Sequence, residues 1–258
     1  MPIHPSAVVD TAAEIDPSVE VGPFTVIQGP VCIRGGTRIS SHAYITGSTE
    51  IGSNCDIHSF TTIGDLPQDR EFSGEESYCQ IGDGVVVREG VSIHRGTAPG
   101  SSTIVGRGCF LMANSHVAHN CTLGEDVVLA NGAILAGHVQ VGDRAFISGN
   151  VAIHQFVRIG ELAMLGGLAK VVMDIPPFFT VGREGTCVGT NVVGLQRAGF
   201  SAEERTEVHN AFRLLYRSGK SFRAAVECLA ASVVTTAGHQ LVAFLLAPTK
   251  RGIASGRG

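Results

Sequence analysis

Hydrophobic residues recur along this chain at a strict interval of six. An Ile, Leu or Val opens a block of six residues 26 times: eleven blocks run without a gap from Ile3 to Ile63, three lie within residues 81–98, and twelve run from Val105 to Val171. An α-helix would repeat its apolar positions every 3.6 residues and a half-buried strand every two. A six-residue period that starts on an aliphatic residue is typical of a parallel β-helix.

The fifth place supports this interpretation because it holds small side chains in block after block from Ala7 to Thr61 and again from Cys109 to Val139. Examples are Ala7, Thr25, Cys55, Cys109 and Cys121. A large residue at place one and a small one at place five suit a narrow coil with tight corners. Three blocks would form one triangular coil of 18 residues, and neighbouring coils would stack at about the 4.8 Å spacing of strands. We therefore predict an all-β rod that buries its core coil on coil.

Two polar stretches interrupt the period and predict loops that leave the rod. They are Asp65 to Gln80 and His94 to Thr103, where the first place of the block falls on charged residues or proline. Loops on a rigid scaffold commonly carry function. The period fades after Pro176 and Pro177, so the rod should end near residue 185.

A helical pattern follows the rod. Ser201 and Glu204 have the spacing of a capping box, a second helix should begin near Ser221, and a third should cover about Gly238 to Ala247. The tail over residues 250–258 is expected to be frayed. We divide the chain into a hexapeptide-repeat domain over residues 1–190 and a C-terminal α-helical domain over residues 191–258.

Composition excludes several classes of protein. The formal net charge is −4, which disfavours nucleic acid as a partner because such proteins carry a basic stripe. No N-terminal basic and apolar leader and no apolar run of 18 residues occur, so we expect a soluble, cytoplasmic protein without membrane insertion. The seven cysteines show no paired spacing and fit core thiols in a reducing compartment.

Candidate chemistry is concentrated within residues 114–155. One 18-residue coil beyond His119 is Gly137, and two coils beyond is Gln155. His138 and His154 flank those two positions, and no loop intervenes to change the register. These side chains should therefore line one stripe of the rod, with His116 at the end of the preceding block.

Three interpretations of this stripe stay open at this point. The histidines could simply occupy outward-facing turns. His94, His116 and His119 could bind zinc, as in a carbonic-anhydrase-like enzyme on the same scaffold. Alternatively, one imidazole could act as a general base at neutral pH. Cys121 stands at the small fifth place and should face the core, so direct transfer is favoured over a covalent enzyme intermediate.

The motifs of this stripe resemble those of the UDP-N-acetylglucosamine O-acyltransferases of lipid A biosynthesis, the LpxA family. The resemblance spans nearly the whole chain. Its segments are SIHRGT (92–97), LMANSHVAHNC (111–121), LANGAILAGHV (129–139), VAIHQF (151–156), DIPPF (174–178) and LLYRSGK (214–220). Hexapeptide repeats alone are shared by many acyltransferases, whereas HVAH, AGHV and IHQF in this order are specific.

The resemblance implies a left-handed β-helix and a homotrimer whose active sites lie between neighbouring subunits. It implies transfer of an (R)-3-hydroxyacyl group from acyl carrier protein to the 3-hydroxyl of UDP-N-acetylglucosamine, the first step of lipid A synthesis. No cofactor is expected besides the phosphopantetheine thioester of the donor. His119 would be the general base, and the backbone N–H of Gly137 would hold the oxyanion. The implied substrate-binding residues are Gln68, Asp69, His116, His138, His154, Gln155, Asn191 and Arg197, together with Gly167 at the position that measures acyl length, where a glycine leaves room for a longer chain.

Four positions depart from the pattern of the family. A lysine expected in the first loop is Glu71, an aspartate often found after the base is Asn120, and a glutamate and an arginine at the nucleotide end are Val193 and Ala198. These changes keep a second acceptor open. The same transfer to a 3-amino sugar nucleotide would give an amide instead of an ester.

Overall fold

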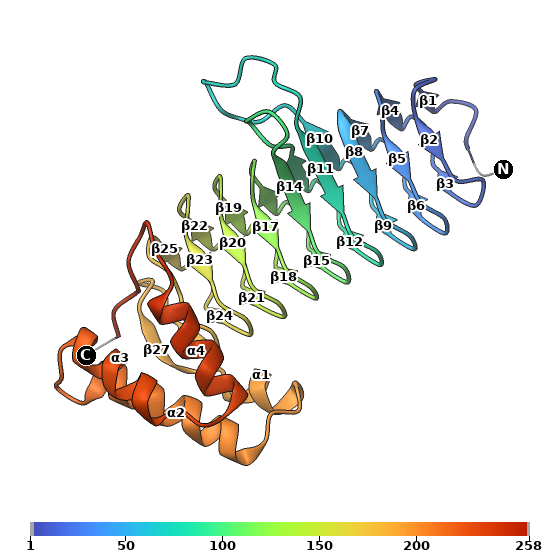
Figure 1. Ribbon diagram of the computed structural model, residues 1–258. Coiled ribbons are helices and arrows are strands. Elements are labelled where there is room, and N and C mark those ends of the chain that lie inside the picture. The colour runs from blue at the N-terminus through green and yellow to red at the C-terminus, as the bar shows by residue number, and fades with distance from the viewer. Residues whose placement is uncertain (1–2, 257–258) are drawn as a thin grey trace.

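The computed structural model describes residues 3–256, which form a triangular rod of β-structure that carries helices at one end (Figure 1). Three parallel sheets are the sides of the rod, and consecutive strands along the chain pass from one sheet to the next. The first sheet contains β1 (Val8–Val9), β4 (Val26–Gln28), β7 (Tyr44–Thr46), β10 (Thr62–Asp65), β13 (Ser92–His94), β16 (His116–Val117), β19 (Ile134–Leu135), β22 (Ala152–Ile153) and β25 (Lys170–Val171).

The second sheet contains β2 (Glu14–Ile15), β5 (Cys32–Ile33), β8 (Ser48–Ile51), β11 (Tyr78–Ile81), β14 (Ser102–Val105), β17 (Thr122–Leu123), β20 (Gln140–Val141) and β23 (Arg158–Ile159). The third contains β3 (Glu20–Val21), β6 (Arg38–Ile39), β9 (Asp56–Ile57), β12 (Val86–Val87), β15 (Phe110–Leu111), β18 (Val128–Leu129), β21 (Phe146–Ile147), β24 (Met164–Leu165), β26 (Phe179–Val181) and β27 (Cys187–Thr190). Among the strands that the structure describes, β26 and β27 alone pair antiparallel.

The predicted 18-residue coil is confirmed by the pairing of the strands. His116 pairs with Ile134, which in turn pairs with Ala152. Every aliphatic residue at place one from Val21 to Val171 is buried in the core. Removing this apolar surface from water, at about 25 cal/mol per Å², is the main force that holds the coils together.

The residue at the fourth place of the block lies in the turn at each corner of the rod, where the chain passes from one sheet to the next. Within residues 3–256, 14 non-glycine residues have a positive φ, and 13 of them lie at this place. The left-handed conformation is uncommon for residues with a side chain, although Asn, Asp and His adopt it more readily than others. The 1–2 edge, where the first sheet passes to the second, carries three of these residues in consecutive coils: Asn120, His138 and Phe156.

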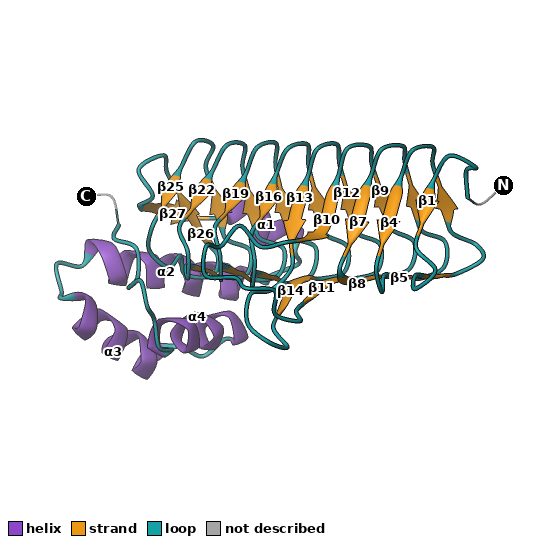
Figure 2. Ribbon diagram, turned by 90° about the horizontal axis from the view of Figure 1, so that it is seen from above, coloured by secondary structure: helices purple, strands orange, loops and turns teal. Residues whose placement is uncertain are grey.

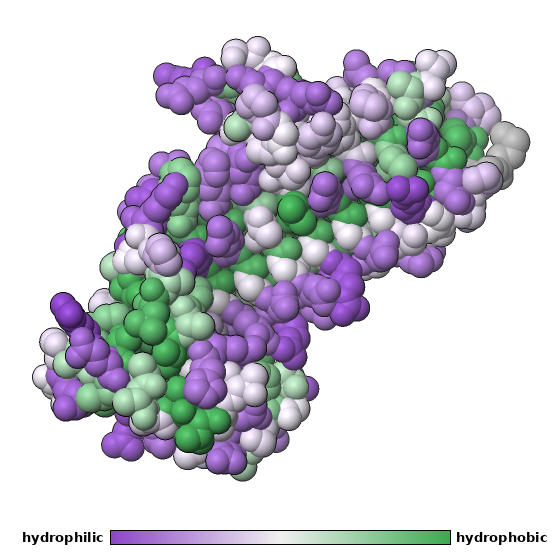
Figure 3. All heavy atoms as spheres, in the orientation of Figure 1, coloured by the Kyte–Doolittle hydropathy of each residue, from purple (hydrophilic) through white to green (hydrophobic). Residues whose placement is uncertain are grey.

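Both predicted loops leave the rod at the 1–2 edge. Residues 66–77 connect β10 to β11, and residues 95–101 connect β13 to β14, so each loop is slightly shorter than expected. Figure 1 shows the two loops projecting together from the rod, and Figure 3 shows hydrophilic residues at the outer end of this projection.

The C-terminal region is helical, as expected. It consists of α1 (Val192–Arg197), α2 (Ala202–Arg217), α3 (Phe222–Ser232) and α4 (Thr236–Leu246). The capping box of Ser201 and Glu204 is present, while α4 begins earlier than predicted because the Thr235 side chain caps it. Figure 2 shows α2, α3 and α4 gathered at the end of the rod opposite the N-terminus. Among the described residues, no helix is both long and apolar enough to cross a membrane.

The prediction of a frayed tail is wrong for residues 250–256, and residues 257–258 lie outside the described residues. Ile253 forms a parallel bridge with Asp174, and Gly256 forms one with Cys187. The Tyr216 hydroxyl donates a hydrogen bond to the carbonyl of Ala254 at 2.9 Å. The tail therefore crosses back onto the last coils of the rod.

Candidate active site

The predicted stripe exists at the 1–2 edge. His119 lies in the turn that follows β16, Gly137 lies one coil further along the rod, and Gln155 lies two coils further. The His119 side chain is 13% exposed, whereas His154 and Gln155 are open to solvent. His119 is thus held firmly while one side of the ring remains reachable.

Gly137 provides the space that the His119 ring occupies. A Cβ atom at this position would lie 2.5 Å from Cε1 and 2.6 Å from Nε2 of His119. These distances are shorter than any van der Waals contact, so no other residue fits while the imidazole keeps its place. No acceptor among the described residues takes a hydrogen bond from the Gly137 N–H group.

Asn120 determines which nitrogen of His119 carries the proton. Its Oδ1 accepts hydrogen bonds from the Thr97 backbone N–H at 3.1 Å and from the Thr97 hydroxyl at 2.9 Å. The same oxygen lies 3.0 Å from Nδ1 of His119. Because a backbone N–H can only donate, the amide oxygen faces this side and Nδ1 must also donate. Neutral His119 therefore keeps its lone pair on Nε2.

The first loop brings a carboxylate to that lone pair. Oδ2 of Asp69 lies 3.9 Å from Nε2 of His119. The carboxylate is oriented within its own loop, where Oδ1 accepts from the backbone N–H of Glu71 at 3.0 Å. Gln68 precedes it and is exposed. A negative charge thus stands opposite Nε2, although Asn120 on the other side of the ring has none.

A column of aromatic rings continues from His119 along the edge. The His119 and His138 rings meet edge to face with centroids 5.2 Å apart, and His138 stacks on Phe156 at 4.6 Å. Nζ of Lys250 lies 4.2 Å from the centre of the Phe156 ring. Burial, followed by the neighbouring His119 and Lys250, lowers the pKa of His138, which favours its neutral form.

His116 lies on β16, on the outer side of the first sheet. Its Nδ1 is 2.8 Å from the Ser92 hydroxyl, and its ring meets that of His94 edge to face at 5.3 Å. Burial, reinforced by His94 and His119, lowers the pKa of His116 to about 4. Within residues 3–256, no group of three His, Cys, Asp or Glu side chains is arranged to hold a metal ion. The zinc interpretation gains no geometric support.

Three predicted residues lie elsewhere on the rod. Asn191 caps α1 and donates from Nδ2 to the carbonyl of Leu162, and Arg197 is the last residue of α1. Both line a hollow of about 490 Å³ that also includes Phe146 of the third sheet. Gly167 lies between β24 and β25, where the third sheet passes to the first. One chain therefore does not bring these residues to the 1–2 edge.

Cys121 faces the core, as predicted. It is fully buried, its thiol donates to the carbonyl of Ala136, and burial raises its pKa to about 12. The thiol therefore stays protonated and is not a nucleophile.

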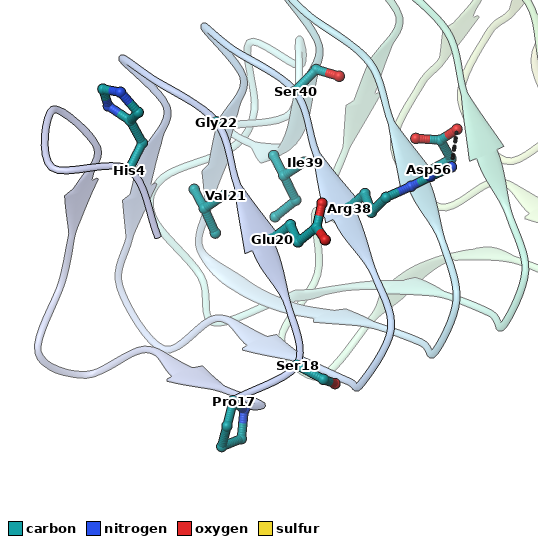
Figure 4. A pocket seen from close by; sticks show the side chains of 10 residues that line it. All are labelled: His4, Pro17, Ser18, Glu20, Val21, Gly22, Arg38, Ile39, Ser40 and Asp56. Carbon is teal, nitrogen blue, oxygen red and sulfur yellow. Dashed lines mark hydrogen bonds and ion pairs between the residues drawn. The ribbon is translucent and has the colours of Figure 1, made fainter. Parts of the chain in front are cut away.

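A further hollow of about 810 Å³ lies on the third sheet near the N-terminus (Figure 4). Glu20, Arg38 and Asp56 face outward there from three successive coils, and Arg38 pairs with Asp56 at 3.2 Å. Figure 4 shows these side chains lying along the sheet. These side chains of alternating charge are in contact with solvent, and they lie several coils away from His119 along the rod.

Sequence reasoning missed three contributors to the site. Thr97 belongs to the motif SIHRGT, but only the fold shows that it holds Asn120. Phe156 belongs to the motif IHQF, and its position 18 residues after His138 could have revealed the stack. Nothing in the sequence pointed to Lys250, because it belongs to the tail over residues 250–258 that was expected to be frayed.

Two family models match the chain. The model described as "Udp N-acetylglucosamine O-acyltransferase; Domain 2" matches residues 174–254, and the model for the bacterial transferase hexapeptide of six repeats matches residues 102–137.

Solved structures match over nearly the whole length. LpxA from Bacteroides fragilis, a UDP-N-acetylglucosamine acyltransferase, is 38% identical with a TM-score of 0.94 and covers 97% of this chain and 99% of its own. The acyltransferase of Francisella novicida is 35% identical with a TM-score of 0.95, covering 99% and 95%. LpxA of Acinetobacter baumannii is 33% identical with a TM-score of 0.93, covering 98% and 100%. The rod is accordingly the left-handed β-helix that was expected.

Proposed function

Because the chain belongs to the UDP-N-acetylglucosamine acyltransferase family, we propose that it moves an (R)-3-hydroxyacyl group from acyl carrier protein to the 3-hydroxyl of UDP-N-acetylglucosamine. The observation that carries the proposal is the arrangement of His119, with Nδ1 donating to Asn120 and Nε2 left as an acceptor opposite Asp69. Such an imidazole is suited to remove a proton from a sugar hydroxyl.

The reaction needs no covalent enzyme intermediate. The sugar hydroxyl oxygen attacks the thioester carbon while its proton passes to Nε2 of His119. The hydroxyl has one proton and donates it to Nε2, while the Asp69 carboxylate, 3.9 Å from Nε2, faces the ring that becomes charged. The carbon–sulfur bond then breaks, and the departing thiolate takes the proton from the imidazolium. During the reaction, Asp69 stabilises the positive ring by charge, a role that Asn120 cannot perform.

The developing oxyanion would be held by the Gly137 N–H group. This donor has no partner among the described residues and belongs to the glycine against which His119 packs. Base and donor are therefore held in a fixed relation before substrate binds. An oxyanion donor of this kind is typically worth about 3–4 kcal/mol of transition-state stabilisation.

A homotrimer forms part of the proposal. The uridine-diphosphate end of the substrate would meet Asn191, which caps α1, and Arg197, the last residue of α1, whereas His119 lies at the 1–2 edge. A neighbouring chain related by rotation would bring the first group to the second. His116, His138, His154, Gln155, Gln68 and Gly167 keep the substrate contacts that the family implies. A cytoplasmic location follows from the proposed donor.

The test is turnover of purified protein with an acyl carrier protein thioester and UDP-N-acetylglucosamine. His119→Ala should lower kcat by about 10²–10⁴-fold, because proton transfer in the transition state is lost. Full activity in that variant, with its folding confirmed by circular dichroism, would contradict the role of the base. Treating the product with mild alkali separates an ester, which hydrolyses, from the amide expected of a 3-amino acceptor.

A further inference from the structure

The C-terminal tail forms one wall of a hollow of about 470 Å³ beside the candidate active site. His138 and Phe156 line it from the corner of the rod, Gln140 lines it from β20, and Thr249 and Lys250 line it from the tail. Asn120, which holds His119, also borders it. The hollow thus borders two residues that contact His119, namely Asn120 and His138.

The hollow is positively charged. None of its lining residues is acidic. Arg158, which also lines it, is neutralised by the buried Asp174, with Nε to Oδ2 at 2.7 Å. Lys250 has no carboxylate partner among the described residues. Its ammonium lies over the Phe156 ring, where three N–H donors remain available to a ligand.

The tail is fixed in this position by several hydrogen bonds. The Thr249 hydroxyl donates to Oδ2 of Asp174 at 2.6 Å, and the backbone N–H of Asp174 donates to the carbonyl of Gly252 at 2.8 Å. Nε of Arg251 donates to the carbonyl of Gln155 at 2.7 Å. Because these bonds hold the residues on both sides of Lys250, its charge is positioned before a ligand binds.

We infer that this hollow binds the phosphate of the donor's phosphopantetheine arm and that Lys250 is the cation that recognises it. The inference rests on the proposed function and adds a donor subsite to it. The arm carries its thioester at one end and a phosphodiester at the other. With the thioester at Gly137, the arm can follow the rings of His138 and Phe156 toward Lys250, which attracts an anionic oxygen.

Three donors separate the sources of the effect. An acyl carrier protein thioester has both phosphate and protein, acyl-phosphopantetheine has the phosphate alone, and acyl-pantetheine has neither. Lys250→Gln should raise the KM for acyl-phosphopantetheine about tenfold with kcat unchanged, because one charged hydrogen bond is lost. The KM for acyl-pantetheine and the KM for UDP-N-acetylglucosamine should not change. Lys220→Gln, which makes the same charge change in the loop after α2, should alter none of these values.

Other outcomes would overturn the inference. An equal effect on both small donors would mean that the phosphate is not recognised, and an effect on the carrier protein alone would mean that Lys250 contacts protein. A change confined to UDP-N-acetylglucosamine would assign the hollow to the acceptor's diphosphate. Calorimetry with free phosphopantetheine and free pantetheine gives the same comparison without turnover. A tenfold weaker Kd for phosphopantetheine alone supports the inference even if the proposed reaction fails, and an unchanged Kd refutes it.

Discussion

The His119 ring occupies the space into which any residue other than glycine at position 137 would place its Cβ atom. Gly137→Ala should displace the His119 ring, since the new Cβ would lie 2.5 Å from Cε1. A shift of about 1 Å can lower turnover roughly 100-fold. We expect kcat to fall by that order while the melting temperature changes little, measured by the acyltransfer assay and by thermal unfolding.

Gly149→Ala is the matched control. Gly149 also lies in a corner turn, but a Cβ there would meet only the carbonyl of Asn131, at 3.4 Å. This variant should keep its activity. Equal losses of activity in both variants would show that activity depends on glycine in the corner turns generally, and not on the space that Gly137 leaves for His119.

His116 should make the protein less stable in mild acid. Its pKa is about 4 in the folded chain, against an ordinary value of 6.5 when unfolded. Between these values the unfolded chain binds a proton that the folded chain does not, so the free energy of unfolding falls as pH falls through this window. In His116→Gln the decrease between pH 7 and pH 5 should be smaller, as urea unfolding at the two pH values would show. An unchanged pH slope would contradict the burial of neutral His116.

At the scale of elements, Asp174 joins the rod, the helical region and the tail. Its carboxylate is fully buried and accepts from Nε of Arg158 and from the Thr249 hydroxyl, while the Arg158 guanidinium lies over Phe244 of α4. Asp174→Asn leaves a buried positive charge without its partner and should reduce the free energy of unfolding by about 3–5 kcal/mol. Urea unfolding measures this change.

Glu227→Gln provides the comparison for Asp174. It removes the carboxylate of an exposed pair with Arg223 on α3 and should leave stability almost unchanged. A similar loss in both variants would show that burial of the Asp174 pair is not the source of its effect.

The strands could be predicted from the sequence because each depends on its own block of six. The capping box at Ser201 and Glu204 is likewise a local signal, and the structure contains it. The order of the tail could not be predicted, because it depends on Asp174, 75 residues before Thr249 in the chain. Helix α1 has only six residues and no apolar period of its own.

The stripe at the 1–2 edge was predictable for the same reason as the strands. A fixed coil length places His119, Gly137 and Gln155 one above another. The contacts of Asp69 and Thr97 were not predictable, because both residues lie in loops whose course the repeat does not determine.

At the scale of the whole molecule, the two groups of predicted site residues lie on different sides of the rod. If the site is shared between chains, His119→Ala and Arg197→Ala should each be inactive alone but recover activity after mixing. Random exchange within trimers would restore about one quarter of the sites. Activity after denaturing and refolding the two variants together measures the recovery, and sedimentation measures the oligomer. No recovery in mixed trimers would mean that Arg197 of one chain does not serve the His119 site of another.

The two loops leave the rod at one edge, beside the histidines. Because coils stack at a spacing of about 4.8 Å, a loop that moves by a whole coil changes its height relative to His119 by that step and by nothing smaller. A displacement of these loops along the rod can therefore change the space beside His119 only in steps of one coil, and finer adjustment must come from exchanging individual side chains.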